Sequence, residues 1–268
     1  MNKEAREEKG QLLNIKDLQE QHFSQFDPVT LGEMEQVDLM DRVDRKFLFG
    51  ARHLERIFEE MRDNYRVLTI EEQSYSHLDS LYFDTPDSMF FYQHHNGKLN
   101  RHKVRFRYYH NTRLNYLEVK FKNNKGRTLK NRILRDSSQE LPFKDNETQF
   151  LQNHIPVEPE ILSPQIWVSF TRLNFLHKEK HERLTLDLNL TFQHQEKKIS
   201  FPEVVIAELK QSIHESYADF AQLMKNRQIR PTPFSKYCIG MCLLHDLKSN
   251  RFKSILLNLK NINRHAYA

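Results

Sequence analysis

Short segments in which charged and apolar residues alternate recur along this 268-residue chain, and this alternation constrains the fold more than any other feature. Lys103, Arg105 and Arg107, for example, are interleaved with Val104 and Phe106. Successive side chains of a β-strand point to opposite faces, so each such segment is expected to form a strand with one charged and one apolar face. Many such strands with few helical patterns predict a large antiparallel sheet that closes into a barrel.

We expect strands at Val43–Phe49, Val67–Glu71, Leu78–Phe83, Lys103–Tyr109, Tyr116–Lys122, Thr128–Leu134, Ile166–Leu173, Arg183–Leu190 and Val204–Lys210, with further pairing around Thr191–Ser200. Helices are expected at Ala51–Asn64, Tyr217–Asn226 and Ser235–Lys248, where apolar residues recur at helical spacing. The expected fold class is α+β: a closed antiparallel β-barrel, or tunnel, of about eight strands with flanking helices. We expect a polar tail or capping helix over 1–26, one domain over 27–248 and a C-terminal tail over 249–268.

Positive charge is concentrated in one part of the chain. The net charge of the whole chain is only +5, yet the segment from Lys98 to Arg135 has a single acidic residue, Glu118, among many Lys and Arg. Like charges opposite one another destabilise a sheet unless an anion neutralises them. If the strands close into a barrel, apolar side chains can pack outward under helices while the cations line the interior. The pattern therefore indicates a polyanionic partner, such as a chain of phosphates with a divalent metal.

The glycines exclude two common ways of holding phosphate. The chain has six, and no two are spaced as in the P-loop or the dinucleotide-binding fingerprint. Side chains would therefore have to bind any phosphate. Two cysteines, a charged N-terminus and the lack of a long apolar run predict a cytoplasmic protein.

A series of short motifs resembles the VTC domain, the polyphosphate polymerase domain of the vacuolar transporter chaperone complex and its bacterial relatives. This domain belongs to the triphosphate tunnel metalloenzymes, a CYTH-like superfamily. The motifs are Asp44-Arg45-Lys46-Phe47, Leu81-Tyr82-Phe83-Asp84-Thr85, Arg105-Phe106-Arg107, Leu117-Glu118-Val119-Lys120, Lys130-Asn131-Arg132, Phe170-Thr171-Arg172, Arg183-Leu184-Thr185-Leu186-Asp187, Glu208-Leu209-Lys210 and Phe234-Ser235-Lys236-Tyr237. They occur in the family's order across residues 27 to 247.

The resemblance implies a set of site residues on the inner face of the tunnel. The implied phosphate ligands are Lys46, Arg105, Arg107, Lys120, Lys130, Arg172, Arg183 and Lys236, and we add Arg132 and Lys210. Six of these are expected to act in catalysis: Arg105, Arg107, Lys120, Arg172, Arg183 and Lys236. Glu208 is the implied ligand of Mn²⁺ or Mg²⁺, and Glu118 is expected to orient the neighbouring cations.

Two positions depart from the family pattern. The wider superfamily opens with Glu-x-Glu-x-Lys, whereas this chain has Arg42 and Asp44 before Lys46, which favours the VTC branch over triphosphatases with several glutamates. The family's late loop often has a lysine two residues before the serine, and this chain has Pro233 there.

The function implied by the resemblance is a metal-dependent polyphosphate polymerase that transfers the γ-phosphoryl group of ATP to a polyphosphate chain. The alternatives are a tripolyphosphatase or nucleoside triphosphatase of the same superfamily, and a binding module for polyphosphate or RNA without turnover. Tyr108 and Tyr109 beside arginines keep RNA binding open, although a nucleic-acid partner is disfavoured. Family members often work beside membrane proteins, so a separately encoded membrane partner at the inner face of a membrane also stays open.

Overall fold

The computed structural model describes residues 12–37, 42–136, 141, 143–214 and 217–264. Residues 1–11 and 265–268, which belong to the two expected tails, lie outside these ranges. The strands are β1 (Asp27–Val29), β2 (Arg42–Gly50), β3 (Tyr65–Leu68), β4 (Ser76–Asp84), β5 (Arg101–Tyr109), β6 (Leu114–Lys122), β7 (Thr128–Arg135), β8 (Ser163–His177), β9 (Glu182–His194), β10 (Lys197–Phe201) and β11 (Val204–Ser212). All nine expected strands are present with shifted ends, and β10 accounts for the pairing expected around Thr191–Ser200.

Eight α-helices flank the strands in the described part of the chain. They are α1 (Ile15–Gln21), α2 (Leu31–Gln36), α3 (Leu54–Met61), α4 (Met89–His95), α5 (Asp145–Gln152), α6 (Asp219–Asn226), α7 (Lys236–Leu244) and α8 (Lys253–Arg264). Short 3₁₀ turns occur at Phe23–Gln25, Ala51–His53, Pro159–Ile161 and Asn250–Phe252. The expected helices correspond to α3 with its preceding 3₁₀ turn, α6 and α7. The segment expected to be a C-terminal tail contains α8, whose Ile255 and Leu259 are buried.

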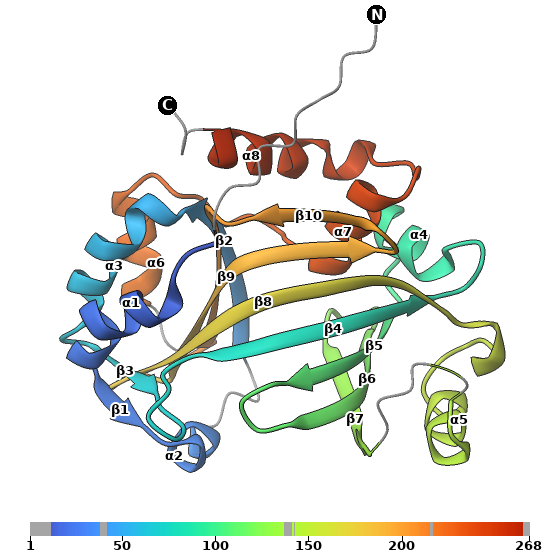
Figure 1. Cartoon of the computed structure of the whole chain (residues 1–268), viewed down its shortest axis with the longest axis horizontal. Helices are drawn as coiled ribbons and strands as arrows, with labels where there is room; N and C mark the ends of the chain where they lie inside the picture. The colour runs from blue at the N-terminus through green and yellow to red at the C-terminus, as the bar shows by residue number, and fades with distance from the viewer. Residues whose placement is uncertain (1–11, 38–41, 137–140, 142, 215–216, 265–268) are drawn as a thin grey trace, which may run out of the picture.

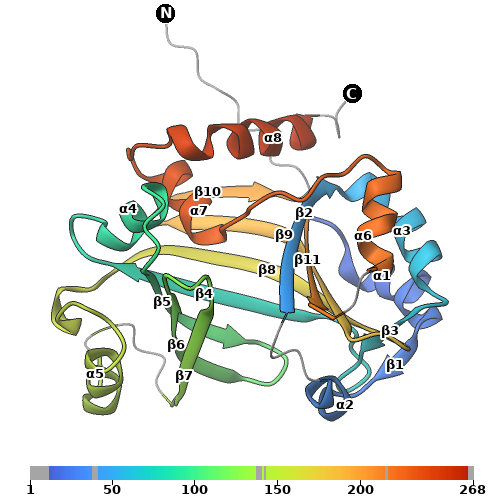
Figure 2. The ribbon, with the colours of Figure 1, turned by 180° about the vertical axis from the view of Figure 1, so that it is seen from behind.

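The strands form one sheet in the order β2-β11-β9-β8-β4-β5-β6-β7, and every neighbouring pair along this path is antiparallel. The sheet is strongly curved: in Figure 2, β2 and β7 both lie on the viewer's side of β8. Among the described residues, these two terminal strands do not pair with each other. The α+β class and the antiparallel sheet with flanking helices are therefore confirmed, whereas closure into a barrel is not.

The edge of β2 that pairs with no other described strand is covered by the segment around Pro231 and Thr232. Phe47 forms an isolated bridge with Pro231, and the backbone N–H of Thr232 donates to the carbonyl of Lys46 at 2.7 Å. Proline cannot donate a backbone hydrogen bond, so this segment covers the edge without continuing the sheet.

Strand alternation gives the sheet two different faces. We call the face that carries Arg105, Glu118 and Glu208 the inner face, since residues paired across neighbouring strands share a face. On the opposite, outer face, apolar side chains of β9 and β11 pack against α1, α3 and α6, and those of β5 and β6 pack near α5. Helices therefore pack on this apolar face toward its two ends, with α1 and α3 at the left of Figure 1 and α5 at the lower right.

The inner face is divided into a charged part and an apolar part. Asn189 has a positive φ of 54° beside an irregularity in the pairing of β9 with β8. A residue inserted there shifts the alternation, which lets Leu190 and Phe192 follow Asp187 on the inner face. Asparagine tolerates this left-handed conformation better than most residues. The apolar part of the inner face packs against α7 and α8, so α7 lies over one end of the face.

The close packing of α7 depends on Gly240. A Cβ atom there would lie 2.5 Å from Ile166 Cδ1 and 2.7 Å from Phe192 Cδ1. We expect Gly240→Val to lower the free energy of unfolding by roughly 1–3 kcal/mol, because the larger side chain overpacks this contact. Gly32→Ala is the control, since no atom lies within 4 Å of the added Cβ. Urea unfolding checks both, and equal stability of Gly240→Val and the wild type would contradict the packing argument.

Candidate polyphosphate-binding site

A basic cavity of about 510 Å³ opens between β2 on one side and β5 and β6 on the other. Its floor and walls also include the segment 231–235 and residues of α4 and α7. Seven of its lining residues are basic and one, Asp44, is acidic. The basic ones are Arg45, Lys46, Arg101, Lys103, Lys120, Lys122 and Arg251. Of the residues predicted from the sequence, Lys46 and Lys120 line this cavity.

Glu118 is the centre of the first cluster of predicted residues on the inner face. The Arg105 guanidinium donates to Glu118 Oε2 from Nε at 2.8 Å and Nη2 at 2.5 Å, and Lys130 Nζ lies 2.5 Å from Oε1. The Glu118 side chain is fully buried. Burial opposes its charge, but Arg105, Arg107 and Lys130 hold the pKa of its carboxyl far below the usual range. The expectation that Glu118 orients cations matches these contacts.

Tyr82 extends this cluster toward the core. Its hydroxyl accepts a hydrogen bond from Arg105 Nη1 at 2.9 Å, and its ring stacks on Tyr237 with centroids 5.1 Å apart. Burial raises the pKa of this phenol, but Arg105 and Arg107 outweigh burial and lower the pKa to about 8. Arg105 is thus fixed by a carboxylate and a phenol at once, and its guanidinium is pre-oriented.

Asp187 is the centre of a second cluster. Arg172 donates to its two carboxylate oxygens at 2.6 and 2.8 Å, and Lys236, the first residue of α7, also donates to it. Lys236 Nζ lies 4.3 Å from the centroid of the Phe170 ring, which is a cation–π contact. Burial of the Lys236 ammonium lowers its pKa to about 8, against the attraction of Asp187. Its charge is therefore sensitive to pH near neutrality.

Glu208 is the third acidic centre and pairs with two lysines. Lys46 Nζ is 3.8 Å from its carboxylate, and Lys210 donates to the same carboxylate. Burial opposes ionisation, but Lys46 and Lys210 hold the pKa of Glu208 well below its usual value. Glu208 also interacts electrostatically with Lys120 of β6, although β11 and β6 are far apart in the sheet order. The curvature of the sheet therefore brings the charged parts of these strands toward each other.

Several cations of the inner face, among them Lys103, Arg107 and Lys120, have no carboxylate partner in the described part of the chain. Lys103 donates to the hydroxyl of Ser235 at 3.0 Å and Arg107 to that of Ser80 at 3.2 Å, while Lys120 makes no ion pair. Repulsion from Arg105, followed by burial, holds the pKa of Lys120 well below its usual value. An anion in this place would relieve this repulsion.

Two predicted residues are held apart from these clusters. Arg132 is exposed and lies over the Tyr116 ring, with its guanidinium carbon 4.5 Å from the ring centroid. Arg183 lies near the start of β9, in register with Lys210, and donates to the carbonyl of Val37. The roles of all these residues in binding phosphate remain predictions.

The structure adds residues that the predicted site set does not contain. Lys103 and Arg101 line the basic cavity. Both occupy alternate positions of β5 with Arg105, so the sequence pattern already places them on the same face as Arg105. His94 also lines it, and its buried Nε2 has no hydrogen-bond partner among the described residues. Burial and then the charges of Lys103 and Arg101 lower the pKa of His94 to about 2, so this imidazole is neutral. No sequence pattern marks His94.

The donor set around Glu208 fits a divalent cation that is held mainly by a phosphate ligand. Within the described ranges, no three His, Cys, Asp or Glu side chains are grouped closely enough to hold a metal ion by themselves. Mg²⁺ and Mn²⁺, however, are commonly held by one or two carboxylates together with substrate phosphates. Glu208 is ionised and its side chain is 22% exposed, so it can provide one such oxygen.

The chain thus has a curved antiparallel sheet of the α+β class with many cations on its inner face. The family model of the VTC domain matches residues 41–245, so the chain belongs to the VTC domain family. The resemblance seen in the sequence motifs is therefore confirmed at the level of the family. No curated protein matches this sequence. No helix in the described ranges is both long and apolar enough to cross a membrane.

The solved structures that match this chain are distant from it in sequence. A candidate adenylate cyclase from Bacillus halodurans is 16% identical, with a TM-score of 0.49 over 79% of this chain and 97% of that chain. A candidate adenylate cyclase from Vibrio parahaemolyticus is 13% identical, with a TM-score of 0.46 over 76% and 99%. HpAC1 from Hippeastrum, a candidate adenylyl cyclase described as having a dominant triphosphatase activity, is 10% identical, with a TM-score of 0.46 over 76% and 96%.

The lowered pKa of Lys236 leads to a prediction about pH. We expect the affinity for tripolyphosphate to fall as the pH rises from 7 to 9, because Lys236 loses its proton in this range and an anion binds the protonated form. Lys236→Arg should bind with a smaller fall, since arginine stays charged. Calorimetric titrations of both proteins at each pH check this, and the comparison cancels the titration of the ligand itself. Identical pH profiles would contradict the assignment of the fall to Lys236.

Proposed function

We propose that this chain is a metal-dependent polyphosphate polymerase that transfers the γ-phosphoryl group of ATP to a polyphosphate chain. The observation that carries the proposal is the set of Lys103, Arg107 and Lys120, which have no carboxylate partner among the described residues. They lie on a face that also carries the ionised Glu208. A chain of phosphates neutralises several cations at once and brings the remaining oxygens that a divalent ion needs.

In the proposed reaction, a terminal oxygen of the polyphosphate chain forms a bond to the γ-phosphorus of ATP. The bond from that phosphorus to the β–γ bridging oxygen breaks, and ADP leaves with the electron pair. Arg105 and Lys130, oriented by Glu118, would hold phosphate oxygens together with Arg107 and Lys120. Arg172 and Lys236, oriented by Asp187, would hold the transferred group. Phosphoryl transfer depends mainly on such positioning and charge neutralisation.

Glu208 would hold the Mn²⁺ or Mg²⁺ ion that neutralises negative charge on the phosphate oxygens. Lys46 and Lys210 lie on either side of this carboxylate and keep it ionised. The proposal includes that the basic cavity surrounds the phosphate chain as a tunnel. The segment 231–235 would then form the wall between β2 on one side and β5 and β6 on the other. The proposal also includes a cytoplasmic location and a separately encoded membrane protein as partner of this chain.

Two other functions remain to be distinguished. A triphosphatase would use the same cations with water as acceptor, and a binding module would use them without turnover. RNA binding is supported least, because Glu208 and Lys210 share the inner face with Lys46 through the register of β11 and β2. A concave face favours a narrow phosphate chain over an RNA duplex.

The deciding experiment is incubation of the protein with ATP and Mn²⁺, followed by ³¹P NMR. Growth of a mid-chain phosphate resonance is expected. Release of orthophosphate alone would identify a triphosphatase, and unchanged ATP together with tight binding of tripolyphosphate would identify a binding module. A competition experiment tests RNA binding. If RNA displaces ATP at the same concentration as tripolyphosphate, the phosphate site is not enclosed.

A further inference from the structure

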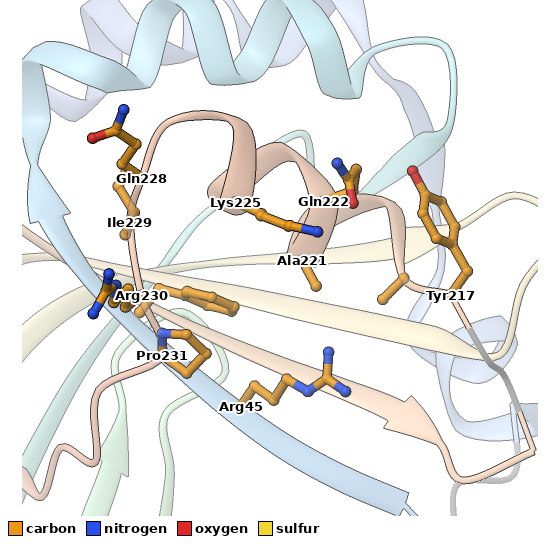
Figure 3. A pocket seen from close by; sticks show the side chains of 11 residues that line it. Arg45, Tyr217, Ala221, Gln222, Lys225, Gln228, Ile229, Arg230 and Pro231 are labelled. Atoms are coloured by element: carbon orange, nitrogen blue, oxygen red, sulfur yellow. The ribbon is translucent and has the colours of Figure 1, made fainter.

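A second cavity, of about 610 Å³, lies beside β2 (Figure 3). It is lined by Arg45 and Phe47, whose side chains alternate along the strand with that of Lys46. Its walls are β2, the residues leading into α6, α6 itself and the segment Gln228–Pro231. Gln228 has a positive φ of 58°, and the N–H of Ile229 donates to the carbonyl of Met224 at 2.9 Å. This turn ends α6 and places Ile229 and Arg230 beside β2. The volume is within the roughly 300–1,000 Å³ of small-molecule sites.

The charged residues that line this second cavity are all basic: Arg45, Lys225 and Arg230. None of the three makes an ion pair with a described residue. Arg227, by contrast, is outside the lining and pairs with Glu60. In Figure 3, Lys225 and Arg45 run toward the same side of the cavity, whereas the guanidinium of Arg230 points to the other side. Lys225 and Arg45 are therefore placed to bind one anionic group.

The rest of the lining is unlike that of the basic cavity. Phe47, Ala218, Ala221 and Ile229 provide apolar surface, and Tyr217, whose side chain is half exposed, lies at one end. Gln222 and Gln228 also line the cavity, and the Gln222 amide already donates to Asn226 Oδ1 at 2.8 Å. Apolar surface gains nothing from an inorganic phosphate chain, but it favours a flat organic ring.

We propose that this second cavity binds a small organic phosphate, in which one anionic group is joined to a flat heterocyclic ring, as in a nucleoside monophosphate. The phosphate lies between Lys225 and Arg45, and the ring lies on the apolar surface near Ala221 and Ile229. The site is separate from the phosphate chain, since Lys46 and Phe47 point to opposite faces of β2. Only Arg45 and Pro231 line both cavities.

The test is calorimetric titration with AMP in the presence of saturating tripolyphosphate, which occupies the basic cavity. We expect AMP to bind at least about tenfold more tightly than either inorganic phosphate or adenosine, because each of these lacks one half of the contacts. Lys225→Gln should weaken AMP binding by about tenfold or more, since it removes a charge-assisted contact. Lys225 is exposed, so this change is expected to leave the fold intact.

Two further variants make the result specific. Lys198→Gln removes an equal charge from an exposed position of β10 and should leave AMP binding unchanged. Ala221→Phe should block AMP by filling the cavity without changing any charge. Absence of AMP binding, or equal weakening by Lys225→Gln and Lys198→Gln, would overturn the proposal. The readout is binding alone, so it stays decisive if the chain proves to be a triphosphatase or a binding module.

Discussion

Replacing Glu208 by glutamine is expected to reduce turnover of ATP at least about 100-fold, because the change keeps the size of the side chain but removes the charge that would hold the cation. The fold should stay intact, since Lys46 and Lys210 are each partly exposed and water can solvate them when Glu208 loses its charge. ATP binding should persist, because the other cations of the inner face remain. Steady-state assays with Mn²⁺, together with calorimetric titration of ATP, measure both effects.

Glu196→Gln is the matched control for this experiment. Glu196 is an exposed carboxylate in the turn between β9 and β10, so its replacement should change neither turnover nor binding. If Glu208→Gln keeps full activity, the metal is bound elsewhere or is not needed. If it loses binding and turnover together, Glu208 organises the cations instead of holding a metal.

Replacing Glu118 by glutamine is expected to lower the free energy of unfolding by about 3–5 kcal/mol, because the buried Arg105 guanidinium then lacks its counter-charge, while the Lys130 ammonium is exposed enough to be solvated. Tripolyphosphate should restore much of this loss, since it supplies the missing negative charge and binds only the folded protein. Thermal unfolding with and without tripolyphosphate measures the loss and the rescue.

The buried ion pair of Glu147 and Arg135 provides the control, because it lies outside the inner face. Arg135 Nε is 2.6 Å from Glu147 Oε1, and both side chains are almost fully buried. Glu147→Gln should destabilise the protein to a similar extent. Tripolyphosphate should stabilise this variant no more than it stabilises the wild type. Equal rescue of both variants would show that the anion acts on the protein generally and not at Glu118.

Alternation of side chains was sufficient to predict the antiparallel sheet and the charged face of strands such as β5. Lys103, Arg105 and Arg107 lie on one strand with their apolar neighbours outward, because burial of one face fixes the orientation of the whole strand. Helices α4 and α5 were not predicted from the sequence, because each buries few apolar residues at helical spacing: Phe90 and Phe91 are adjacent in α4, and Leu151 is the one buried apolar residue of α5. The segment of α8 does carry Ile255, Leu259 and Ile262 at helical spacing, which is a signal for a helix within the expected C-terminal tail.

The site was only partly predictable, because its geometry depends on contacts between distant segments. The motifs identify the cations, and Glu118 was expected to orient its neighbours, but the motifs do not say which cations it contacts or that Asp187 orients Arg172 and Lys236. The change of face at Asn189 depends on an irregular pairing with β8, which leaves no periodic trace in the sequence. Lys225 and Arg45 come together only because α6 packs beside the edge of the sheet.

The covered edge of β2 has a consequence for how a long polyanion enters the basic cavity. A barrel closed by hydrogen bonds all round admits a chain only end-first, so a chain capped by a bulky group at each end is excluded. Here the boundary beside β2 is a segment fastened by the Thr232 N–H to the Lys46 carbonyl and by Lys46 Nζ to the Phe234 carbonyl. Lifting it breaks no ladder between strands, so lateral loading of a doubly capped chain, or of an internal stretch of a very long one, is topologically allowed.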